Sequence, residues 1–303
     1  MKPVIGVIGL GIMGSAMAKA LVKAGFSVVG YDVRLKARDD LKRAGGRSAP
    51  SCAAVAKTAD IVITSLATSA ALEKVTAEIA SSLSASRKSG RRIIMIDTCT
   101  LPIADKERAQ ALLSRAGVTM LDCPISGTAA RLKQGTWTIF VSGGAAACKK
   151  IQPILHVFTR NTPYVGGFGS GSKMKFIANH LVAIYNVAVG ETMTFARKMG
   201  LDAQQVWDLF AASPVVGNGV FKLRGKFMVD RKYLPATMKI EVWQKDMQVI
   251  GDMAKSVDCP VPLFTACVPI YSAAMGQGLS QRDTASVCEV LDRMAGGSRR
   301  KRA

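Results

Sequence analysis

Histidine and aromatic residues are scarce in this chain, with only two histidines and 6% aromatic residues among 303 amino acids. So few histidines argue against a His-built metal cage and against a Ser-His-Asp triad, and we predict no metal site. Seven cysteines form no C-x-x-C pair and are odd in number. Such cysteines are typical of reduced thiols rather than a disulfide framework, which predicts a cytoplasmic protein.

Long apolar runs are also missing, because no stretch reaches the roughly 20 apolar residues that a membrane span requires. The N-terminus leads directly into a strand pattern without a cleavage site, so we expect no signal peptide and no membrane partner. What the chain does have is length for two domains and 49% apolar residues, enough for two buried cores.

Acidic residues are few relative to basic ones, and the formal net charge is +20. A basic surface favours anionic partners such as dinucleotides and organic acids, but it also suits nucleic acid. The charge alone does not choose between these classes.

Short β-rich runs alternate with helical patterns in the N-terminal half, which predicts a parallel sheet covered on both faces. The expected strands are Pro3–Ile8, Ser27–Tyr31, Ile61–Ser65, Ile93–Ile96 and Val118–Leu121, with Thr136–Ser142 closing the sheet and a last extended piece near Tyr164–Val165. Helical periodicity covers Met13–Ala24 and Ala70–Ser82, and Ser81–Arg92 is a polar loop.

No convincing strand follows the glycine-rich stretch 166–171, so we place a domain boundary there. We expect a dinucleotide-binding α/β domain over 1–165 and an all-helical domain over 166–295. A long helix over 172–198 connects them, and 296–303 is a basic, disordered tail.

A glycine motif follows the first apolar strand and opens a helix, as dinucleotide binding requires. The motif residues are Gly9, Leu10, Gly11, Ile12, Met13 and Gly14. Asp32 ends the next strand, eighteen residues beyond Gly14, where an acidic residue binds the adenosine ribose. Asp32 would repel a 2′-phosphate and indicates NAD, whereas Arg34 is compatible with that phosphate and keeps NADP open.

A Ser-Gly turn at Ser126 and Gly127 follows the strand that ends near Asp122. Its adjacent backbone N–H groups and its hydroxyl suit a carboxylate, and Arg131 would add a charge-assisted hydrogen bond.

A helix over 172–198 carries apolar residues all around its axis, so we expect it to be buried between domains. Lys175 and Asn179 lie one turn apart on the same face of this helix. An ammonium group on an otherwise apolar helix beside a nicotinamide site is a candidate proton carrier, although snorkelling to solvent is the alternative.

Four segments together resemble the β-hydroxyacid dehydrogenase family in order and spacing. They are GVIGLGIMG, DCPISGTAARLKQGTWTIFVSGG, GSGSKMKFIANH and the late Lys245-Asp246. The resemblance implies a Rossmann-type N-terminal domain, a long connecting helix, an all-α C-terminal domain and a homodimer or homotetramer. It also implies an NAD(P)-dependent 3-hydroxyacid dehydrogenase with a small anionic hydroxyacid or semialdehyde as substrate.

The same resemblance assigns roles to individual residues. Lys175 matches the catalytic lysine and Asn179 its hydrogen-bonding partner. Ser126 and Gly127, with Thr128, match the turn that binds the substrate carboxylate. The residues that match cofactor contacts are Thr100, Lys245, Leu66 and Ala67. Asp246 is expected to orient Lys245 or to cap a helix.

Thr128 departs from the family pattern, because many members carry a second glycine there, as does Cys99, where serine is common. The Ala-Ala-Arg after Thr128 resembles the threonate dehydrogenase branch and favours a sugar acid, beside a 3-hydroxyisobutyrate-like acid. We expect Lys175 to act as general acid and base, with a pKa lowered by burial and by nearby positive charge.

Three alternatives stay open beside this interpretation. The first is a semialdehyde or glyoxylate reductase working in the reductive direction. The second is an imine reductase, which shares the architecture but usually carries another residue at the position of Lys175, so this lysine argues against it. The third is a non-catalytic, nucleic-acid-associated homologue, suggested by the basic charge and the terminal SRRKRA.

Overall fold

The computed structural model describes residues 2–84 and 92–296, and two compact units, Met1–Lys175 and Phe176–Ala303, divide the chain. The tail predicted over 296–303 lies outside the described residues beyond Gly296, as does 85–91 of the predicted polar loop. The domain boundary predicted at 166 stays a prediction.

Six parallel strands form the sheet of the first unit, in the order β3-β2-β1-β4-β5-β6. The strands are β1 (Ile5–Ile8), β2 (Val28–Tyr31), β3 (Arg47–Ser48), β4 (Ile61–Thr64), β5 (Ile93–Asp97) and β6 (Val118–Asp122). Of these six strands only β3 is not predicted from the sequence, because it has two residues, one of them exposed, and no apolar run. The predicted Rossmann-type architecture is confirmed, since the chain reverses direction across the sheet between β1 and β4.

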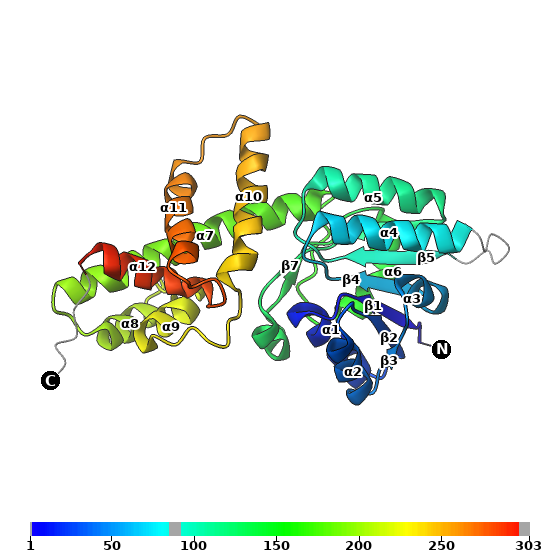
Figure 1. The fold of residues 1–303 in the computed structure, drawn as a ribbon, viewed down its shortest axis with the longest axis horizontal. Helices are drawn as coiled ribbons and strands as arrows, with labels where there is room; N and C mark the ends of the chain where they lie inside the picture. Colours follow the sequence, from blue (N-terminus) through cyan, green and yellow to red (C-terminus); the bar gives the residue numbers. More distant parts are fainter. Residues whose placement is uncertain (1, 85–91, 297–303) are drawn as a thin grey trace. The chain divides into compact units, whose positions relative to one another are not determined.

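Helices cover both faces of this sheet (Figure 1). On one face α1 (Ile12–Lys23), α2 (Leu35–Arg43) and α6 (Ala145–Leu155) bury Met17, Leu41 and Ile151 against the strands. On the other face α3 (Cys52–Thr58), α4 (Ser69–Ser84) and α5 (Ile103–Arg115) bury Val55, Leu72 and Leu113. Strands with both faces covered form nearly continuous apolar runs, and β1 and β4 are buried at every position.

The expectation that Thr136–Ser142 closes the main sheet is wrong. Within that run β8 (Thr138–Ile139) pairs antiparallel with β7 (Ile125–Ser126) in a separate two-stranded sheet. Only an isolated bridge between Asp122 and Ser142 joins the run to the end of β6. The extended piece near Tyr164 forms a single bridge with Val141.

The second unit is helical, as predicted, and no strand occurs in it up to Gly296. After α7 (Ser170–Lys198) come α8 (Ala203–Ala212), the π-helix η2 (Phe221–Gly225), α9 (Lys226–Asp230), α10 (Ile240–Ser256), α11 (Pro262–Gly276), the 3-10 helix η3 (Thr284–Ser286) and α12 (Val287–Met294). Asn186 of α7 donates from Nδ2 to the Tyr271 hydroxyl at 3.1 Å and to the Thr284 carbonyl at 2.8 Å. These bonds hold α11 and η3 against α7.

One expectation for α7 is corrected: several of its apolar side chains are exposed rather than buried. Met174, Ile177, Leu181 and Tyr185 are 43%, 62%, 43% and 39% exposed. Their spacing of three, four and four residues places them on one side of the helix, so α7 carries an apolar exposed stripe. No helix among the parts of the chain that the structure describes is long and apolar enough to cross a membrane.

Candidate active site

Three glycines shape the turn between β1 and α1, each in the way that a bound dinucleotide requires. Gly9 has a φ of +89°, and a Cβ on Gly14 would lie 1.8 Å from the Gly9 carbonyl oxygen. A side chain at either position is therefore excluded. At Gly11, by contrast, a Cβ would meet open space. The turn thus leaves room in front of the N-terminus of α1, where no side chain in 2–84 or 92–296 caps the first N–H groups.

Open space at Gly11 and N–H groups at a helix N-terminus that no described side chain caps fit a pyrophosphate. Ile12 and Met13 begin α1, and Leu10 donates its backbone N–H to the Oδ2 of Asp32 at 2.7 Å. The glycine turn and the acidic residue of the next strand are thereby joined, as the spacing in the sequence predicts.

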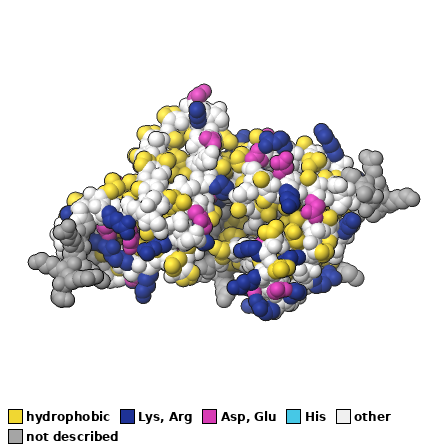
Figure 2. All heavy atoms as spheres, in the orientation of Figure 1, with side chains coloured by type: hydrophobic (Ala, Val, Ile, Leu, Met, Phe, Trp, Pro, Cys, Tyr) yellow, Lys and Arg dark blue, Asp and Glu magenta, His cyan; other side chains and the backbone are white. Residues whose placement is uncertain are grey.

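Arg34 is paired with Asp32. Its backbone N–H and its Nε donate to the Oδ1 of Asp32 at 2.9 and 3.0 Å, and its Nη2 reaches Oδ2 at 3.2 Å. Burial alone would raise the pKa of Asp32, but the hydrogen bonds and the charge of Arg34 outweigh it and hold that pKa below its ordinary value. Asp32 is therefore a carboxylate with Arg34 beside it. Lys and Arg side chains gather over α2 on the face that Figure 2 shows.

The other predicted cofactor residues of the first unit follow β4 and β5. Leu66 and Ala67 come two and three residues after β4, and Thr100 comes three residues after β5. The backbone N–H of Leu66 contacts the Cys99 thiol at 3.0 Å, which joins the two segments. Because parallel strands place their carboxyl ends at one edge of a sheet, these residues share that edge with the glycine turn.

The predicted carboxylate turn is built on a buried tryptophan. Trp137 is fully buried and donates from Nε1 to the Thr128 carbonyl oxygen at 2.7 Å. Gly127 has a φ of +146°, and a Cβ there would lie 2.4 Å from the Trp137 ring. The hydroxyl of Thr128 is buried and has no hydrogen-bond partner among the described residues. Sequence reasoning missed Trp137, because nothing in the sequence pairs it with the turn.

Arg131 lies in the 3-10 helix η1 (Ala129–Gln134) that follows this turn. Its side chain is outside the described part of the structure. A charge-assisted bond from Arg131 to a substrate therefore stays a prediction.

Lys175 and Asn179 are both buried, although α7 exposes apolar residues on its other side. Lys175 belongs to the first unit. Its side chain is only 9% exposed, so it does not extend into solvent as the alternative interpretation expects. Asn179 belongs to the second unit and donates from Nδ2 to the Oδ2 of Asp246 at 2.9 Å. The other oxygen of Asp246 lies 2.6 Å from the Nζ of Lys245. Asp246 thus holds Asn179 and Lys245 together, as expected of a residue that orients Lys245.

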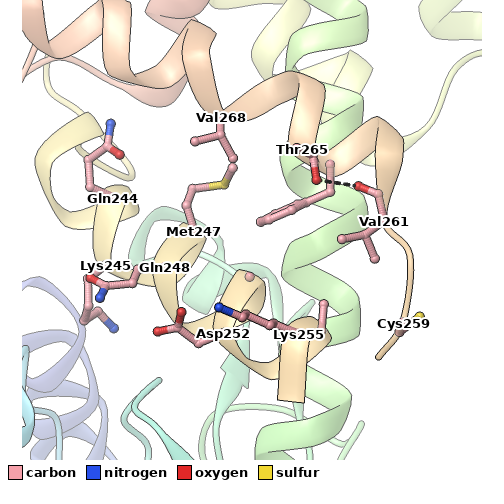
Figure 3. A pocket seen from close by; sticks show the side chains of 13 residues that line it. Gln244, Lys245, Met247, Gln248, Asp252, Lys255, Cys259, Val261, Thr265 and Val268 are labelled. Carbon is pink, nitrogen blue, oxygen red and sulfur yellow. Dashed lines mark hydrogen bonds between the residues drawn. The ribbon is translucent and has the colours of Figure 1, made fainter. Parts of the chain in front are cut away.

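Lys245 also lines a groove of about 740 Å³ between α10 and α11 (Figure 3). Met247, Phe264 and Val268 supply apolar surface, and Asp252 and Lys255 add charge. Of the 13 residues that line this groove, Lys245 alone belongs to the predicted site. A large pocket is often the active site, but the residues that line this groove do not match a nicotinamide site. We therefore do not assign the active site to this groove.

The sequence matches two protein-family models, and both describe dinucleotide-binding dehydrogenases. Residues 4–166 match the family model described as the NAD-binding domain of 6-phosphogluconate dehydrogenase. Residues 169–291 match the model described as NAD-binding of NADP-dependent 3-hydroxyisobutyrate dehydrogenase. The two matches together cover both units of the chain.

Individual relatives are similar over nearly their whole length. L-threonate dehydrogenase of Cupriavidus necator is 30% identical over 289 residues, which is 95% of each chain. The 2-hydroxy-3-oxopropionate reductase of Escherichia coli is 29% identical, over 96% of this chain and 98% of that one. The crystal structure of 3-hydroxyisobutyrate dehydrogenase from Salmonella typhimurium superposes with a TM-score of 0.83 at 26% identity, covering 95% of this chain and 100% of the other.

The chain belongs to the β-hydroxyacid dehydrogenase family. Membership confirms the resemblance, the two-part fold and the expectation of an NAD(P)-dependent oxidoreductase. The roles of individual side chains, among them Lys175, are not tested by these similarities and stay proposals.

Proposed function

We propose that this protein interconverts a small hydroxyacid and the corresponding aldehyde or ketone acid, with NAD as the preferred dinucleotide. The observation that carries the proposal is the buried position of Lys175 in the first turns of α7. A buried amine close in the chain to a dinucleotide-binding sheet is suited to carry a proton.

When bound, the nicotinamide accepts or supplies the hydride. During oxidation of the alcohol, Lys175 takes the hydroxyl proton as the carbinol hydride leaves, and it returns that proton during reduction. Ser126, Gly127 and Thr128 hold the substrate carboxylate through the hydroxyls and the backbone N–H groups of the turn. Asn179 positions the substrate, and Asp246 fixes its amide.

The hydroxyl of Thr128, which has no hydrogen-bond partner among the described residues, supports a hydroxylated sugar acid as the substrate class. A buried hydroxyl without a partner is costly, and an additional hydroxyl of a sugar acid would satisfy it. The name of the relative from Cupriavidus necator, L-threonate dehydrogenase, is consistent with this substrate class. We therefore propose that the substrate is L-threonate, or a closely related sugar acid, rather than 3-hydroxyisobutyrate.

Preference for NAD rests on Asp32. Its carboxylate would repel a 2′-phosphate, and Arg34 partly neutralises that charge while it stays paired with Asp32. A cytoplasmic location is proposed as well, because all seven cysteines are free and six of them are buried. The exposed stripe on α7 supports a homodimer or homotetramer.

An initial-rate screen tests the proposal. NAD and NADP are each offered with L-threonate, 3-hydroxyisobutyrate, glycerate, 4-hydroxybutyrate and the matching semialdehydes. We expect turnover with NAD and a sugar acid. Faster turnover of a semialdehyde with the reduced cofactor would assign the reductive direction. Absence of turnover with every substrate, combined with salt-dependent DNA binding, would instead support the nucleic-acid-associated alternative.

A further inference from the structure

A lysine of the first unit is completely buried at the edge of the sheet that carries the predicted site. Lys106 of α5 has 0% exposed surface. Its Nζ lies 2.7 Å from the Oδ1 of Asp122 and 2.9 Å from the Oδ2 of Asp97, the last residues of β6 and β5. The same Nζ donates to the Cys99 carbonyl oxygen at 2.5 Å. Two segments of chain, the end of β5 with Cys99 just beyond it and the end of β6, therefore converge on one ammonium group.

Lys106 is charged in this setting. Burial alone would lower its pKa, but the attraction of Asp97 and Asp122 outweighs burial and holds that pKa above its ordinary value. The contact with the Oδ2 of Asp97 lies outside hydrogen-bonding geometry and is electrostatic only, because that oxygen accepts no hydrogen bond from the described residues. The other oxygen of Asp97 accepts the Thr64 hydroxyl at 2.7 Å.

Asp122 connects this lysine to the beginning of α7. Its Oδ2 accepts the backbone N–H of Ser172 at 2.7 Å, and its Oδ1 accepts the Ser172 hydroxyl at 2.9 Å. The Ser142 hydroxyl accepts the N–H of Gly171 at 2.9 Å and donates to the Asp122 carbonyl at 2.8 Å. N–H groups of a first helical turn lack partners within the helix, so the Asp122 carboxylate satisfies that of Ser172, and its negative charge interacts favourably with the positive end of the helix dipole.

Close packing fixes the same turn. A Cβ on Gly171 would lie 2.6 Å from the Phe140 carbonyl and 2.7 Å from the Asp122 carbonyl. The backbone of α7 therefore rests directly on the backbone of the sheet edge. Lys175 follows one turn later on the same helix, four residues beyond Gly171.

The other segments held by Lys106 also lead to predicted site residues. Cys99, whose carbonyl Lys106 binds, precedes Thr100 and contacts the N–H of Leu66. Asp122 precedes Ser126 by four residues. One buried cation thus lies between the beginning of the helix that carries Lys175 and the strand ends that carry the cofactor and carboxylate residues.

We propose that Lys106 is a positioning residue for the reaction: through Asp122 and Ser172 it fixes Lys175 relative to Ser126 and Thr100. The effect on catalysis rests on the proposed function, because it requires Lys175 to carry the proton. The anchoring of α7 by Lys106 does not depend on that function. A buried ion triad such as Lys106, Asp97 and Asp122 stabilises a fold less than apolar packing of similar volume does. Its role here is to hold its partners in one geometry.

The test compares Lys106→Met with Arg108→Met, an exposed cation two residues further on α5. It also compares Ser172→Ala with Ser170→Ala at the first residue of α7. For each variant kcat and KM for L-threonate with NAD, the Kd of NADH by fluorescence, and backbone hydrogen exchange over 170–175 are measured. Ser172→Ala removes one hydrogen bond only, so it remains informative if Lys106→Met does not fold.

We expect Lys106→Met to lower kcat about 10- to 100-fold, because a misplacement of about 1 Å costs up to about 100-fold. We expect Ser172→Ala to act in the same direction and less strongly. KM for L-threonate and the Kd of NADH should change less than about threefold, since Trp137 holds the carboxylate turn and the glycine turn is not part of this network. Exchange over 170–175 should accelerate about tenfold in Lys106→Met, and the controls should match the unaltered chain.

Unchanged kcat and unchanged exchange in both variants would overturn the proposal, even if the melting temperature fell, because a purely structural role predicts that pattern. The proposed function fails separately, if Lys175→Ala turns over normally. Should the chain not oxidise L-threonate at all, hydrogen exchange alone decides: an unaltered rate over 170–175 refutes the anchoring.

Discussion

Asn179 and Asp246 are joined by a buried hydrogen bond of 2.9 Å from the amide Nδ2 to the carboxylate Oδ2. Lys245 lies on the other oxygen of the same carboxylate, so one acidic side chain orients two residues that the sequence assigns to the site. Asp246 was expected to orient Lys245, but its bond to Asn179 was not expected. A carboxylate that holds both has consequences for mutants of either partner.

We expect Asp246→Ala to reduce kcat/KM more than Asn179→Ala, because it removes the contact with Lys245 as well as the hydrogen bond from Asn179. The double variant should lose less than the product of the two single losses, since residues in contact are not additive. Steady-state kinetics on the four proteins of this cycle check the prediction. Asp252→Ala on the same helix serves as the control, and fully multiplicative losses would contradict the coupling.

Lys175→Ala should lower kcat about 10²- to 10⁴-fold, which is the usual contribution of a general acid or base. Affinity for NADH should change little, because the glycine turn and Asp32 are intact. Lys173→Ala, an exposed lysine two residues earlier, is the matched control. Near-normal turnover of Lys175→Ala would remove Lys175 from the chemistry.

Asp32→Ala should shift the cofactor preference toward NADP. Loss of the carboxylate removes the repulsion of a 2′-phosphate and releases Arg34, whose side chain is already 61% exposed. We expect the ratio of kcat/KM for NADP to that for NAD to rise about tenfold or more, which corresponds to about 1.4 kcal/mol. Initial rates with both cofactors measure the ratio. A second substitution, Arg34→Ala, should reverse part of the gain, and no reversal would argue that Arg34 does not meet the phosphate.

Acid should destabilise the protein through Asp283, which is buried with Arg224. Burial alone would raise the pKa of Asp283, but the charge of Arg224 and hydrogen bonds from Ala285 and Thr237 hold it below the ordinary value of 3.8. Because the folded-state pKa is the lower one, the stabilisation is fully present above the unfolded-state value and is lost as the pH falls through the folded-state value. Urea unfolding from pH 7 to pH 3 should therefore show a steeper loss for the unaltered chain than for Asp283→Asn. The exposed Asp208→Asn is the control, and parallel curves for Asp283→Asn would contradict the assignment.

Substitution of the exposed stripe on α7 should weaken self-association. Ile177→Lys and Leu181→Lys place charge on side chains that are 62% and 43% exposed, so the isolated subunit should tolerate them. We expect a smaller particle in light scattering at equal concentration, with secondary structure retained. Lys173→Glu tests whether charge alone produces the change. An unaltered particle size would place the assembly surface elsewhere.

Much of the fold was predictable because its signals are local. Strands β1 and β4 are continuous apolar runs bounded by turns, and the glycine motif lies directly between a strand and a helix. The two-residue β3 carries too little pattern to be seen. The antiparallel pairing of Thr138 with Ser126 depends on where the chain folds back, which periodicity does not encode.

The candidate site was predictable where a known sequence motif specifies the residue types and their spacing, as at Gly9 and Asp32. It was not predictable where residues distant in the sequence converge. Lys106 sits in a helix beside Asp105, Glu107 and Arg108, and a charge run of this kind usually marks a solvated face. Only the fold shows that this one side chain turns inward toward Asp97 and Asp122.

Trp137 lies beneath Gly127, where a Cβ would meet its ring at 2.4 Å. The conformation of the turn from Ser126 to Thr128, which we propose to bind the substrate carboxylate, therefore depends on a buried side chain of the hydrophobic core. Variant libraries intended to change substrate selectivity should therefore include Trp137 and its neighbour Phe158. Substitutions there would shift the backbone of the turn without changing the residues of the turn itself.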